Sequence, residues 1–443
     1  MKPNQRPHLR GWRGQAFADL VRGVCPEQIL CVSIDVSKDF HVVLLHNGLG
    51  EVVTPSFEID IFRTGFDQLC QAVEAAIATN GAQVVLVGME PTGHYYENLA
   101  RHLQATGQKV TLVNSFAVKE NRRQQMMAHE KDDEIDVAAI GDLLRRGEGS
   151  PFRPPTGIYL QMQQLDRARL GELKIQTIYK NRVIGHLDRI FPGLILTKAA
   201  TKERYIPLFA TDFWQCQTLQ DLVRICPDPR QLAAFSPADL VALFHQHGCR
   251  MGPRTASCII AYAQKVLWPD PKVVAIRCQL LATDLQTLDQ VTARVDLYSQ
   301  QLRQLLSQTP YQFLAQFKGL PPLRVASLAA AAGDPANYRC ARQLFRRSGL
   351  VSGRDDSGAR QRQGQGKAVV KTGDIYLRRA LNDLLNGLIL HQPALRAYYH
   401  HLKQTKPVGV ARVATIRRAV GILWATLRDQ RADTLVLRGE PMT

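Results

Sequence analysis

Residues 28–48 read QILCVSIDVSKDFHVVLLHNG and contain two short apolar runs separated by a polar turn. The first run, QILCVSIDVS (28–37), is rich in β-branched residues and carries Asp35 near its end. The second run, FHVVLLHNG (40–48), follows after only two residues. Short β-branched runs joined by a tight polar turn predict a hairpin of antiparallel strands. The hairpin begins the fold and places an acidic residue near the end of its first strand.

Alternating strand and helix patterns continue from this hairpin to about residue 150. VVTPSFEI (52–59) is expected to be a third strand, and residues 63–81 have apolar side chains at helical spacing. The further elements that we expect are a strand at 83–90, a helix at 95–107, a strand at 109–114 and helices near 115–128 and 133–146. Three antiparallel strands and then a β-α-β unit is the order of the ribonuclease-H-like fold, whereas a Rossmann order would begin with a helical crossover.

The rest of the chain is expected to be mainly helical. PFRPPTG (151–157) is a proline-rich boundary, and a long amphipathic pattern follows it and ends at Phe191-Pro192-Gly193. Shorter helices are expected over 205–268. The predicted fold class is α/β plus all-α. We expect a basic N-terminal extension (1–27), an α/β domain (28–150), a helical and coiled-coil region (151–310), a mainly α-helical C-terminal domain (311–430) and a tail (431–443).

Residues 271–308 have an apolar seam at helical spacing. The seam consists of Val274, Cys278, Leu281, Leu285, Leu288, Val295 and Leu302, with polar Thr292 and Ser299 in register. Such a seam suits a coiled-coil arm. An amphipathic helix packed on its own chain would have the same pattern, so both interpretations stay open.

The formal net charge of +17, from 56 basic and 39 acidic residues, is distributed unevenly. Residues 1–27 carry +3, residues 28–150 carry −7 and residues 151–443 carry +21. A strongly basic body favours a polyanionic partner, and nucleic acid is a better candidate than a membrane surface. The acidic module indicates a carboxylate-bearing site on one part of the chain and polyanion contacts on the other.

The cysteines and the hydropathy pattern narrow the class of protein. Nine scattered cysteines without a C-x-x-C pair indicate neither a disulfide framework nor a zinc site. The basic N-terminus lacks an apolar core of signal-peptide length, and no stretch approaches the ~18 apolar residues of a membrane span. We therefore expect a cytoplasmic protein rather than a secreted or integral membrane protein.

Four acidic residues are candidate metal ligands. Asp35 and Glu90 end two strands that are neighbours in a ribonuclease-H-like sheet, and Asp133 and Asp136 lie three apart on one face of a helix. Converging carboxylates repel one another unless cations neutralise them, and Mg²⁺ prefers such oxygen ligands. Two such ions could activate a nucleophile and stabilise a leaving oxygen in phosphodiester chemistry. The ordinary alternative is that these residues cap turns and a helix N-terminus.

The segments that carry these acids resemble the RuvC-like domain of the insertion-sequence-110 transposases. The similarity rests on IDVSKDFHVVLL, MEPTGHYYENLARHL, KVTLVNSFAVKE and KDDEIDVAAI, within residues 30–146. The family's Asp-Glu-Asp-Asp pattern falls on Asp35, Glu90, Asp133 and Asp136, and the resemblance implies that these four residues are catalytic and bind metal. Where the family usually has Lys-Thr-Asp-Arg-x-Asp, this chain has KDDEID (131–136).

Residues 311–428 resemble the second domain of the same family. FKGLPPLRVASLAAAAGD matches the helix-hairpin-helix-like segment, and GLVSGRDDSG (349–358) matches a Gly-Leu-x-Pro-x-x-x-x-Ser-Gly motif, with Ser352 at the usual proline. The resemblance implies that Ser357 is the nucleophilic serine, which attacks a DNA phosphodiester. From the residues alone a loop Ser-Gly is most often a turn, and Ser348 and Ser352 are nearby alternatives.

Basic residues are concentrated around this serine motif. From Tyr338 to Ala380 there are eleven basic and three acidic residues, a net charge of +8. The glycine-rich stretch 360–367 could lie along phosphates or could be a solvated loop. The candidate nucleic-acid-binding residues are Arg346, Arg347, Arg354, Arg360, Arg362, Lys367, Lys371, Arg378 and Arg379.

The resemblance implies a DNA transposase or recombinase of an insertion sequence, with Mg²⁺ as its cofactor and element ends and target DNA as its partners. It further implies a structured guide RNA and action at the bacterial nucleoid, and the expected coiled-coil arm favours a homodimer or homotetramer. Two alternatives stay open. One is a metal-dependent RuvC-like nuclease or junction resolvase in which Ser357 is idle, and the other is a non-catalytic nucleic-acid-binding protein.

Overall fold

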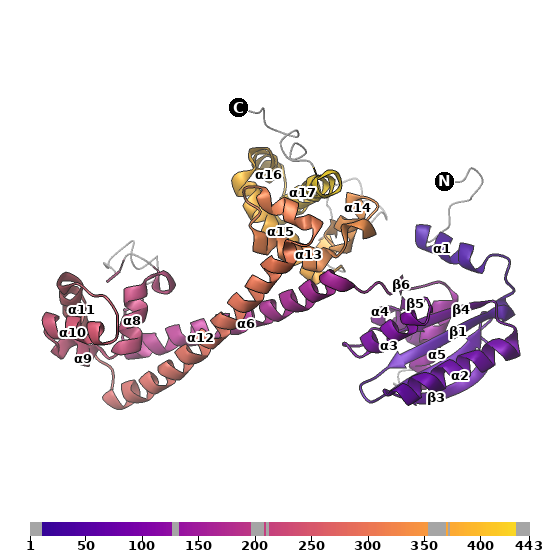
Figure 1. The fold of residues 1–443 in the computed structure, drawn as a ribbon, viewed down its shortest axis with the longest axis horizontal. Helices are drawn as coiled ribbons and strands as arrows, with labels where there is room; N and C mark the ends of the chain where they lie inside the picture. The colour runs from indigo at the N-terminus through magenta and orange to yellow at the C-terminus, as the bar shows by residue number, and fades with distance from the viewer. Residues whose placement is uncertain are drawn as a thin grey trace. The chain divides into compact units, whose positions relative to one another are not determined.

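The structure of the 443-residue chain is a computed structural model. It describes residues 11–125, 133–195, 208–209, 212–352, 369–370 and 373–430 (Figure 1). Internal contacts divide the chain into two compact units, Met1–Pro154 and Pro155–Thr443. The division falls within the proline-rich stretch 151–157, and each unit is described by itself below.

A six-stranded mixed sheet is the centre of the first unit. Its strand order is β3-β2-β1-β4-β5-β6. β2 is antiparallel to both of its neighbours, β1 and β3. The strands β1, β4 and β5 are parallel to one another, and β6 is antiparallel to β5. The strands are β1 (Ile29–Val36), β2 (Phe40–Asn47), β3 (Val52–Asp60), β4 (Val84–Met89), β5 (Val110–Leu112) and β6 (Ser150–Pro151).

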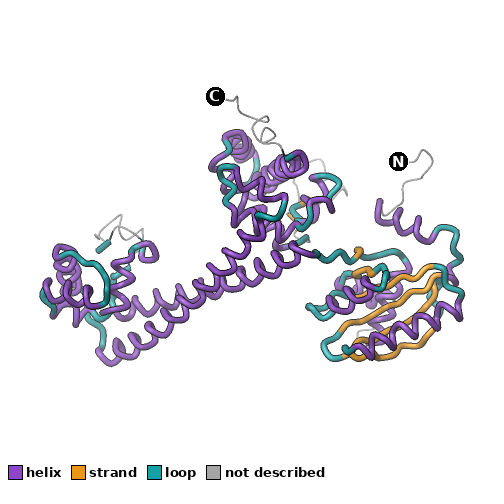
Figure 2. Tube along the Cα trace, in the orientation of Figure 1, coloured by secondary structure: helices purple, strands orange, loops and turns teal. Residues whose placement is uncertain are grey.

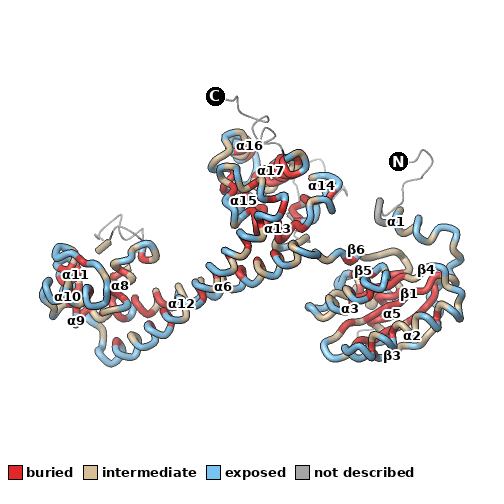
Figure 3. The backbone as a smooth tube through the Cα atoms, in the orientation of Figure 1, coloured by how far each residue is buried: buried red, intermediate tan, exposed pale blue. Residues whose placement is uncertain are grey.

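Helices cover both faces of this sheet. One face packs on α2 (Arg63–Asn80) and α3 (Tyr96–Ala105) and forms the larger apolar core of the unit. The other face packs on α5 (Asp133–Arg145), which in turn contacts α4 (Ser115–Gln125). In β1, Leu30, Val32 and Ile34 belong to the first face, whereas Ile29 and Cys31 belong to the second, as the two-residue period of a strand requires. Figure 3 shows β1 mostly in the colour of buried residues.

Two glycines allow α5 to lie close to the sheet. A Cβ at Gly88 of β4 would lie 2.9 Å from Leu144 Cδ2 of α5. A Cβ at Gly141 of α5 would lie 2.3 Å from His46 Nε2 and 2.8 Å from Ser33 Oγ. Neither gap admits a methyl group, so glycine at both positions fixes the position of α5 on the sheet.

The first helix, α1 (Gly11–Val21), is an element that the sequence analysis did not predict. Phe17 and Val21 of α1 pack against the small core around Cys31, Leu86 and Leu144. Gly147 has φ +69°, and a Cβ there would lie 2.4 Å from Cγ of Phe17. Part of the stretch expected to be an extension therefore packs on the first unit.

Two long antiparallel helices organise the second unit: α6 (Gly157–Ile190) and α12 (Pro271–Leu306). The start of α6 and the end of α12 share one apolar core, which includes Met162 and Leu302. The end of α6 and the start of α12 share another, which includes Leu187 and Val274. Figure 2 shows the two helices side by side. The apolar seam of residues 271–308 thus packs on its own chain, which was one of the two interpretations left open.

Shorter helices surround each end of this pair. Around the core of Leu187 lie η2 (Phe213–Gln215), α8 (Gln217–Ile225), α9 (Pro229–Ala234), α10 (Pro237–Gln246) and α11 (Pro253–Lys265). Around the core of Met162 lie η3 (Pro310–Gln316), α13 (Pro322–Ala332), η4 (Pro335–Asn337), α14 (Ala341–Arg347), α15 (Ile375–His391), α16 (Pro393–Thr405) and α17 (Val408–Asp429). None of the described helices is both long and apolar enough to cross a membrane.

The helix-hairpin-helix-like segment is mainly a core element. Residues 328–332 of α13 are all buried. The loop before α13 contacts α15 so closely that a Cβ at Gly319 would lie 2.6 Å from the carbonyl oxygen of Gly387. A backbone engaged in this packing explains the small residues of the segment without a nucleic-acid contact.

The predicted order of elements is confirmed through the first unit and along the two long helices. β1 to β5, α2 to α6 and α12 each lie within a few residues of the range expected from periodicity. The coarse fold class, an α/β unit followed by a mostly helical one, is also confirmed.

Candidate active site

Asp35 and Glu90 lie at equivalent positions on neighbouring parallel strands. Ile34 of β1 pairs with Met89 of β4, and each acidic residue is the next one in its chain. Both acidic residues are half-buried. Because parallel strands end at the same edge of a sheet, the register places the two carboxylates beside each other at that edge.

The alternation of the strands indicates which face these carboxylates share. Ile34 and Met89 both belong to the core beneath α2 and α3. Their successors, Asp35 and Glu90, therefore fall on the opposite face, which α5 covers. The packing of Ser33 and Gly88 against α5 agrees with this assignment, because each lies an even number of residues from the acid on its strand.

α5 runs antiparallel to β1, so its first turn lies toward the same edge of the sheet. Gly141 packs at the level of Ser33, and Leu144, one turn later, joins the cluster around Cys31. Going back from Gly141 to Asp136 covers about 7.5 Å of helix, and going on from Ser33 to Asp35 covers about 6.6 Å of strand. Asp136 thus lies toward the same edge of the sheet as Asp35.

Asp136 is buried and paired with an arginine. It is 7% exposed, and its Oδ1 accepts a hydrogen bond from Nη1 of Arg122 of α4 at 2.5 Å. The Nε of Arg122 is buried and has no hydrogen-bond partner among the described residues. Asp133, at the start of α5, is exposed, and its neighbour Glu134 accepts a hydrogen bond from Ser56 Oγ of β3 at 2.8 Å.

The donor chemistry of these four residues fits a hard divalent cation, since carboxylate oxygens are its preferred ligands. Their arrangement is incomplete, however. Within the described ranges, no group of three or more His, Cys, Asp or Glu side chains comes close enough together to hold a metal ion. The guanidinium of Arg122 supplies the positive charge that Asp136 needs at its buried position. Asp35 and Glu90 are therefore the two candidate ligands whose relative position is set by the register of β1 and β4.

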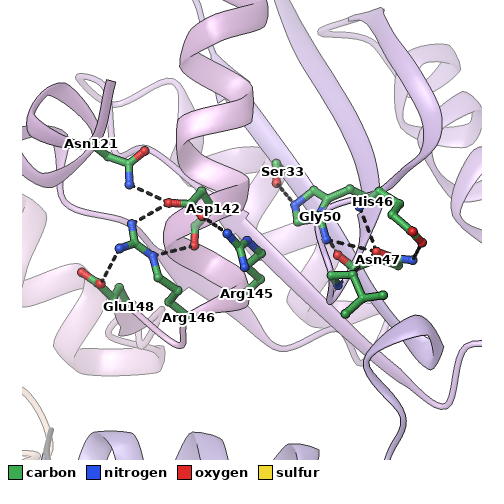
Figure 4. A network of polar contacts seen from close by, with 11 residues as sticks. Ser33, His46, Asn47, Gly50, Asn121, Asp142, Arg145, Arg146 and Glu148 are labelled. Carbon is green, nitrogen blue, oxygen red and sulfur yellow. Dashed lines mark hydrogen bonds and ion pairs between the residues drawn. The ribbon is translucent and has the colours of Figure 1, made fainter. Parts of the chain in front are cut away.

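A polar network joins α4 to α5 (Figure 4). Asp142 of α5 accepts hydrogen bonds from Asn121 of α4 at 2.7 Å, from Arg145 at 2.5 Å and from Arg146 at 2.6 Å. Burial alone would raise the pKa of Asp142, but the Asn121 hydrogen bond and the two arginines outweigh it and hold the pKa below its usual value. Since Asn121 precedes Arg122, this network also positions the arginine that pairs with Asp136.

His46 of β2 is a second buried polar group beside α5 (Figure 4). It is 4% exposed, its Nδ1 lies 2.8 Å from the carbonyl oxygen of Asn47, and its Nε2 lies 3.4 Å from Ser33 Oγ. A carbonyl oxygen only accepts, so Nδ1 carries the proton and Nε2 is free to accept from the serine. Burial lowers the pKa of His46, and the imidazole is therefore neutral at neutral pH.

Two short paired strands lie on either side of the serine of the motif in the second unit. β7 (Val351–Ser352) is antiparallel to β8 (Val369–Val370). Before and after them, Gly349 and Gly373 approach so closely that a Cβ at Gly349 would lie 2.2 Å from the backbone nitrogen of Gly373. Ser357 itself falls between β7 and β8 and lies outside the described residues. The structure thus fixes where the segment leaves and re-enters the helical core.

Ser348 is structural rather than reactive. It is fully buried, and its hydroxyl donates to the carbonyl oxygen of Phe345 at 2.6 Å. The hydroxyl oxygen of Ser348 in turn accepts a hydrogen bond from the backbone nitrogen of Leu350 at 3.3 Å. Ser348 thus caps the C-terminus of α14, and its hydroxyl is not accessible from the surface.

Comparison with known families decides what kind of chain this is. Residues 32–192 match a family model described as a transposase, of the four-carboxylate insertion-sequence-110 type. Residues 311–400 match a second model, described as the transposase IS116/IS110/IS902 family. The two models together cover more than half of the chain. This chain belongs to that family.

A curated relative of this transposase chain is the "Probable family 20 transposase" of Pseudomonas aeruginosa. The two are 30% identical over 151 residues, which is 33% of this chain and 43% of the relative. The match thus spans less than half the length of the relative.

The candidate nucleic-acid-binding arginines of the transposase chain differ in their surroundings. Arg347 donates to the carbonyl oxygen of Ala332 at 2.9 Å and to the Tyr338 hydroxyl at 2.5 Å, and it lies 3.4 Å from an Asp374 oxygen. Arg378 donates to the carbonyl oxygen of Ser348 at 3.3 Å. Arg346 and Arg379 are exposed, and the latter lies 3.8 Å from Asp383. Outside the described residues lie Arg354, Arg360, Arg362, Lys367 and Lys371.

Sequence reasoning missed Arg122 as a partner of the candidate carboxylates. An arginine within a polar helix is ordinarily solvated, and Arg122 and Arg123 look alike in the sequence. Arg123 pairs on the surface with Glu120, whereas Arg122 turns inward to Asp136. Only the packing of α4 on α5 distinguishes the two.

Proposed function

We propose that this family member is a DNA transposase that cleaves and rejoins DNA at the ends of an insertion sequence. The observation that carries the proposal is the equivalent position of Asp35 and Glu90 at the ends of β1 and β4. The strand order of the sheet supports a ribonuclease-H-like, RuvC-like domain, in which such an edge is the place for phosphodiester chemistry.

In this proposal Asp35, Glu90, Asp133 and Asp136 hold divalent metal, with Mg²⁺ the expected ion. The bound metal would neutralise phosphate charge and stabilise developing charge on the reacting oxygens. The protein's own contribution is to orient the ligands, and the sheet does this for Asp35 and Glu90 through the strand register. To hold metal, Asp136 would have to give up its ion pair with Arg122. The positive charge of the metal would then replace that of the guanidinium beside the buried carboxylate.

Ser357 is the proposed nucleophile. Its hydroxyl would attack a DNA phosphorus, displace one strand end and leave a covalent phosphoserine link that a second strand end later displaces. The pairing of β7 with β8 supports this role, because it fixes on the helical core the two positions between which the basic residues 353–368 lie in the sequence. In this proposal the metal bound by the carboxylates would assist the attack of Ser357.

The basic segment around the hairpin would hold nucleic acid through phosphate contacts. Exposed Arg346 and Arg379 are the described residues best placed to do so, since Arg347 already has three internal partners. The family resemblance further suggests a structured guide RNA, a homodimer or homotetramer, and action on DNA in the bacterial cytoplasm.

A strand-joining assay tests this function. Purified full-length protein, with any RNA that copurifies, is incubated with DNA that carries the native element ends, with and without Mg²⁺. We expect joined products that depend on Mg²⁺ and are lost in Asp35→Asn and Ser357→Ala. Ser352→Ala is the matched control, and it should retain activity. Joining by Ser357→Ala at the wild-type rate would contradict the proposal.

A metal-dependent nuclease is the second candidate, and the four carboxylates alone would suffice for it. Cleavage without joining, unaffected by Ser357→Ala and abolished by Asp35→Asn, would favour this candidate. Mg²⁺-independent binding without cleavage would favour a non-catalytic nucleic-acid-binding protein.

A further inference from the structure

A cavity of about 600 Å³ opens in the first unit beside the candidate active site. Its walls come from the turn between β1 and β2, from the start of α2 and from α3. The volume falls in the range of small-molecule and cofactor sites. The residues on which the following argument depends are Lys38, His41, Phe62, Arg63, Tyr95 and Asn98.

A buried histidine forms part of the wall of this cavity. His41 is 5% exposed, and its Nδ1 is shielded from solvent. Burial lowers the pKa of His41, so its ring is neutral at neutral pH. The ring is therefore an uncharged part of the cavity wall.

Aromatic rings line the mouth and the wall of the cavity. Phe62 is 70% exposed, although it is a large apolar side chain. Tyr95 lies against His94 with ring centroids 4.4 Å apart, and Phe66 meets His102 edge-on at 3.9 Å. Exposed aromatic rings provide stacking surfaces for nucleobases, and the exposed Asn98 offers both a donor and an acceptor to a base edge.

The charged groups of the cavity favour an anion at its rim. Lys38 and Arg63 are both exposed there. The one acidic residue of the lining, Asp60, accepts hydrogen bonds from Thr64 Oγ1 at 2.9 Å, from the Phe62 backbone nitrogen at 2.8 Å and from the Gly65 backbone nitrogen at 2.9 Å. The Asp60 carboxylate thus accepts hydrogen bonds at the start of α2, and the side chains of Lys38 and Arg63 are suited to bind a phosphate.

The cavity lies at the same edge of the sheet as the candidate carboxylates. Ser37 in its wall is two residues after Asp35, and His94 is four residues after Glu90. His41 pairs with Val36, which faces α2 and α3, so the cavity lies on the sheet face opposite the carboxylates. A strand that crosses the ends of β1 and β4 can therefore meet both.

We propose that this cavity binds one unpaired nucleotide of the DNA strand that crosses the ends of β1 and β4. The base lies against Phe62 and Tyr95. Its edge meets Asn98, and its phosphate lies at Arg63. The choice of DNA rests on the proposed function, whereas the recognition of an unpaired nucleotide rests on the cavity alone.

Fluorescence of 2-aminopurine tests the proposal without any cleavage. Full-length protein is titrated with a short single-stranded DNA that carries one 2-aminopurine, in EDTA, and with an RNA of the same sequence. We expect binding to the DNA with a change in base fluorescence, and about 10-fold weaker binding by Phe62→Ala, as the loss of one stacked base implies. Asn98→Ala should also weaken binding, and its exposed position leaves the core intact.

Phe116→Ala is the matched control. Phe116 of α4 is 71% exposed in the same unit and does not line the cavity. Equal binding by Phe62→Ala and Phe116→Ala, no fluorescence change, or binding to the RNA alone would overturn the proposal. Strand joining that persists in Phe62→Ala with unchanged DNA affinity would remove this inference and leave the proposed function intact. DNA binding in the cavity by a protein that joins no DNA strands would support this inference and contradict the proposed function.

Discussion

The Nη1 of Arg122 lies 2.5 Å from Oδ1 of Asp136, so the most buried of the four candidate carboxylates is paired with an arginine from the neighbouring helix. This contact joins α4 to α5 near the start of α5. It also orients the Asp136 side chain, and the guanidinium compensates for the water that burial removes.

Removal of this arginine should destabilise the protein. Arg122→Ala leaves the buried Asp136 without its partner, and we expect the free energy of unfolding to fall by about 3 kcal/mol, at the lower end of the range for broken buried pairs. Urea unfolding followed by circular dichroism measures this loss. Arg123→Ala is the control, since its partner Glu120 is on the surface and the change should be below about 0.5 kcal/mol. Equal losses in the two variants would contradict the role of Arg122.

A methyl group at Gly141 should disrupt the packing of α5 on the sheet. Its Cβ would lie 2.3 Å from His46 Nε2 and 2.8 Å from Ser33 Oγ. Both of these residues are buried, so the helix must move. We expect Gly141→Ala to lower the melting temperature, although alanine is the better helix former. Gly171→Ala in α6 is the control, because no described atom lies within 4 Å of the Cβ position there. A Gly141→Ala protein as stable as the Gly171→Ala protein would show that α5 is not closely packed.

Stability should fall in acid through Asp142. Its pKa in the folded chain is below the unfolded value, so its contribution is present above about pH 4 and is lost as the pH falls through the folded pKa. Asp142→Asn should therefore lower stability at pH 7 and flatten the loss of stability below pH 4. Chemical unfolding at a series of pH values from 7 to 3 measures both effects. An unchanged slope below pH 4 would contradict the pairing of Asp142 with Asn121, Arg145 and Arg146.

A buried aspartate should stabilise the long helix pair of the second unit. Asp284 of α12 is 3% exposed and lies 2.9 Å from Arg182 and 3.1 Å from His186, both of α6. We expect Asp284→Ala to lower the free energy of unfolding by about 3 kcal/mol, as for other buried pairs that lose one partner. The same substitution at Asp289, which is exposed and pairs with Arg224, should cost less than about 1 kcal/mol. Similar losses at the two positions would contradict the role of Asp284.

Much of the fold could be predicted because it depends on local periodicity. The β-branched run before Asp35 and the helical spacing of residues 158–190 are properties of the sequence alone, and both gave elements with nearly the expected bounds. The apolar seam of α12 was identified correctly, but its partner could not be, because self-packing and association between chains bury the same face.

The parts that could not be predicted depend on contacts between distant segments. α1 has little helical amphipathicity, and only the close approach of Phe17 to Gly147 gives it a place on the first unit. Arg122 and His41 are inconspicuous in the sequence, and their importance comes from the helix or strand that buries them. The four carboxylates could be named as candidates from the sequence, whereas the arginine that pairs with Asp136 could not.

The central claim is that DNA is cut through a covalent link to Ser357 at a site completed by the carboxylates. The most direct measurement is to trap the protein with DNA that carries the element ends, in Mg²⁺, and to identify the linked peptide by mass spectrometry. The account predicts a DNA adduct on Ser357 that is absent in Ser357→Ala and Asp35→Asn and present in Ser352→Ala. Cleaved DNA without any protein adduct, in amounts unchanged by Ser357→Ala, would contradict it.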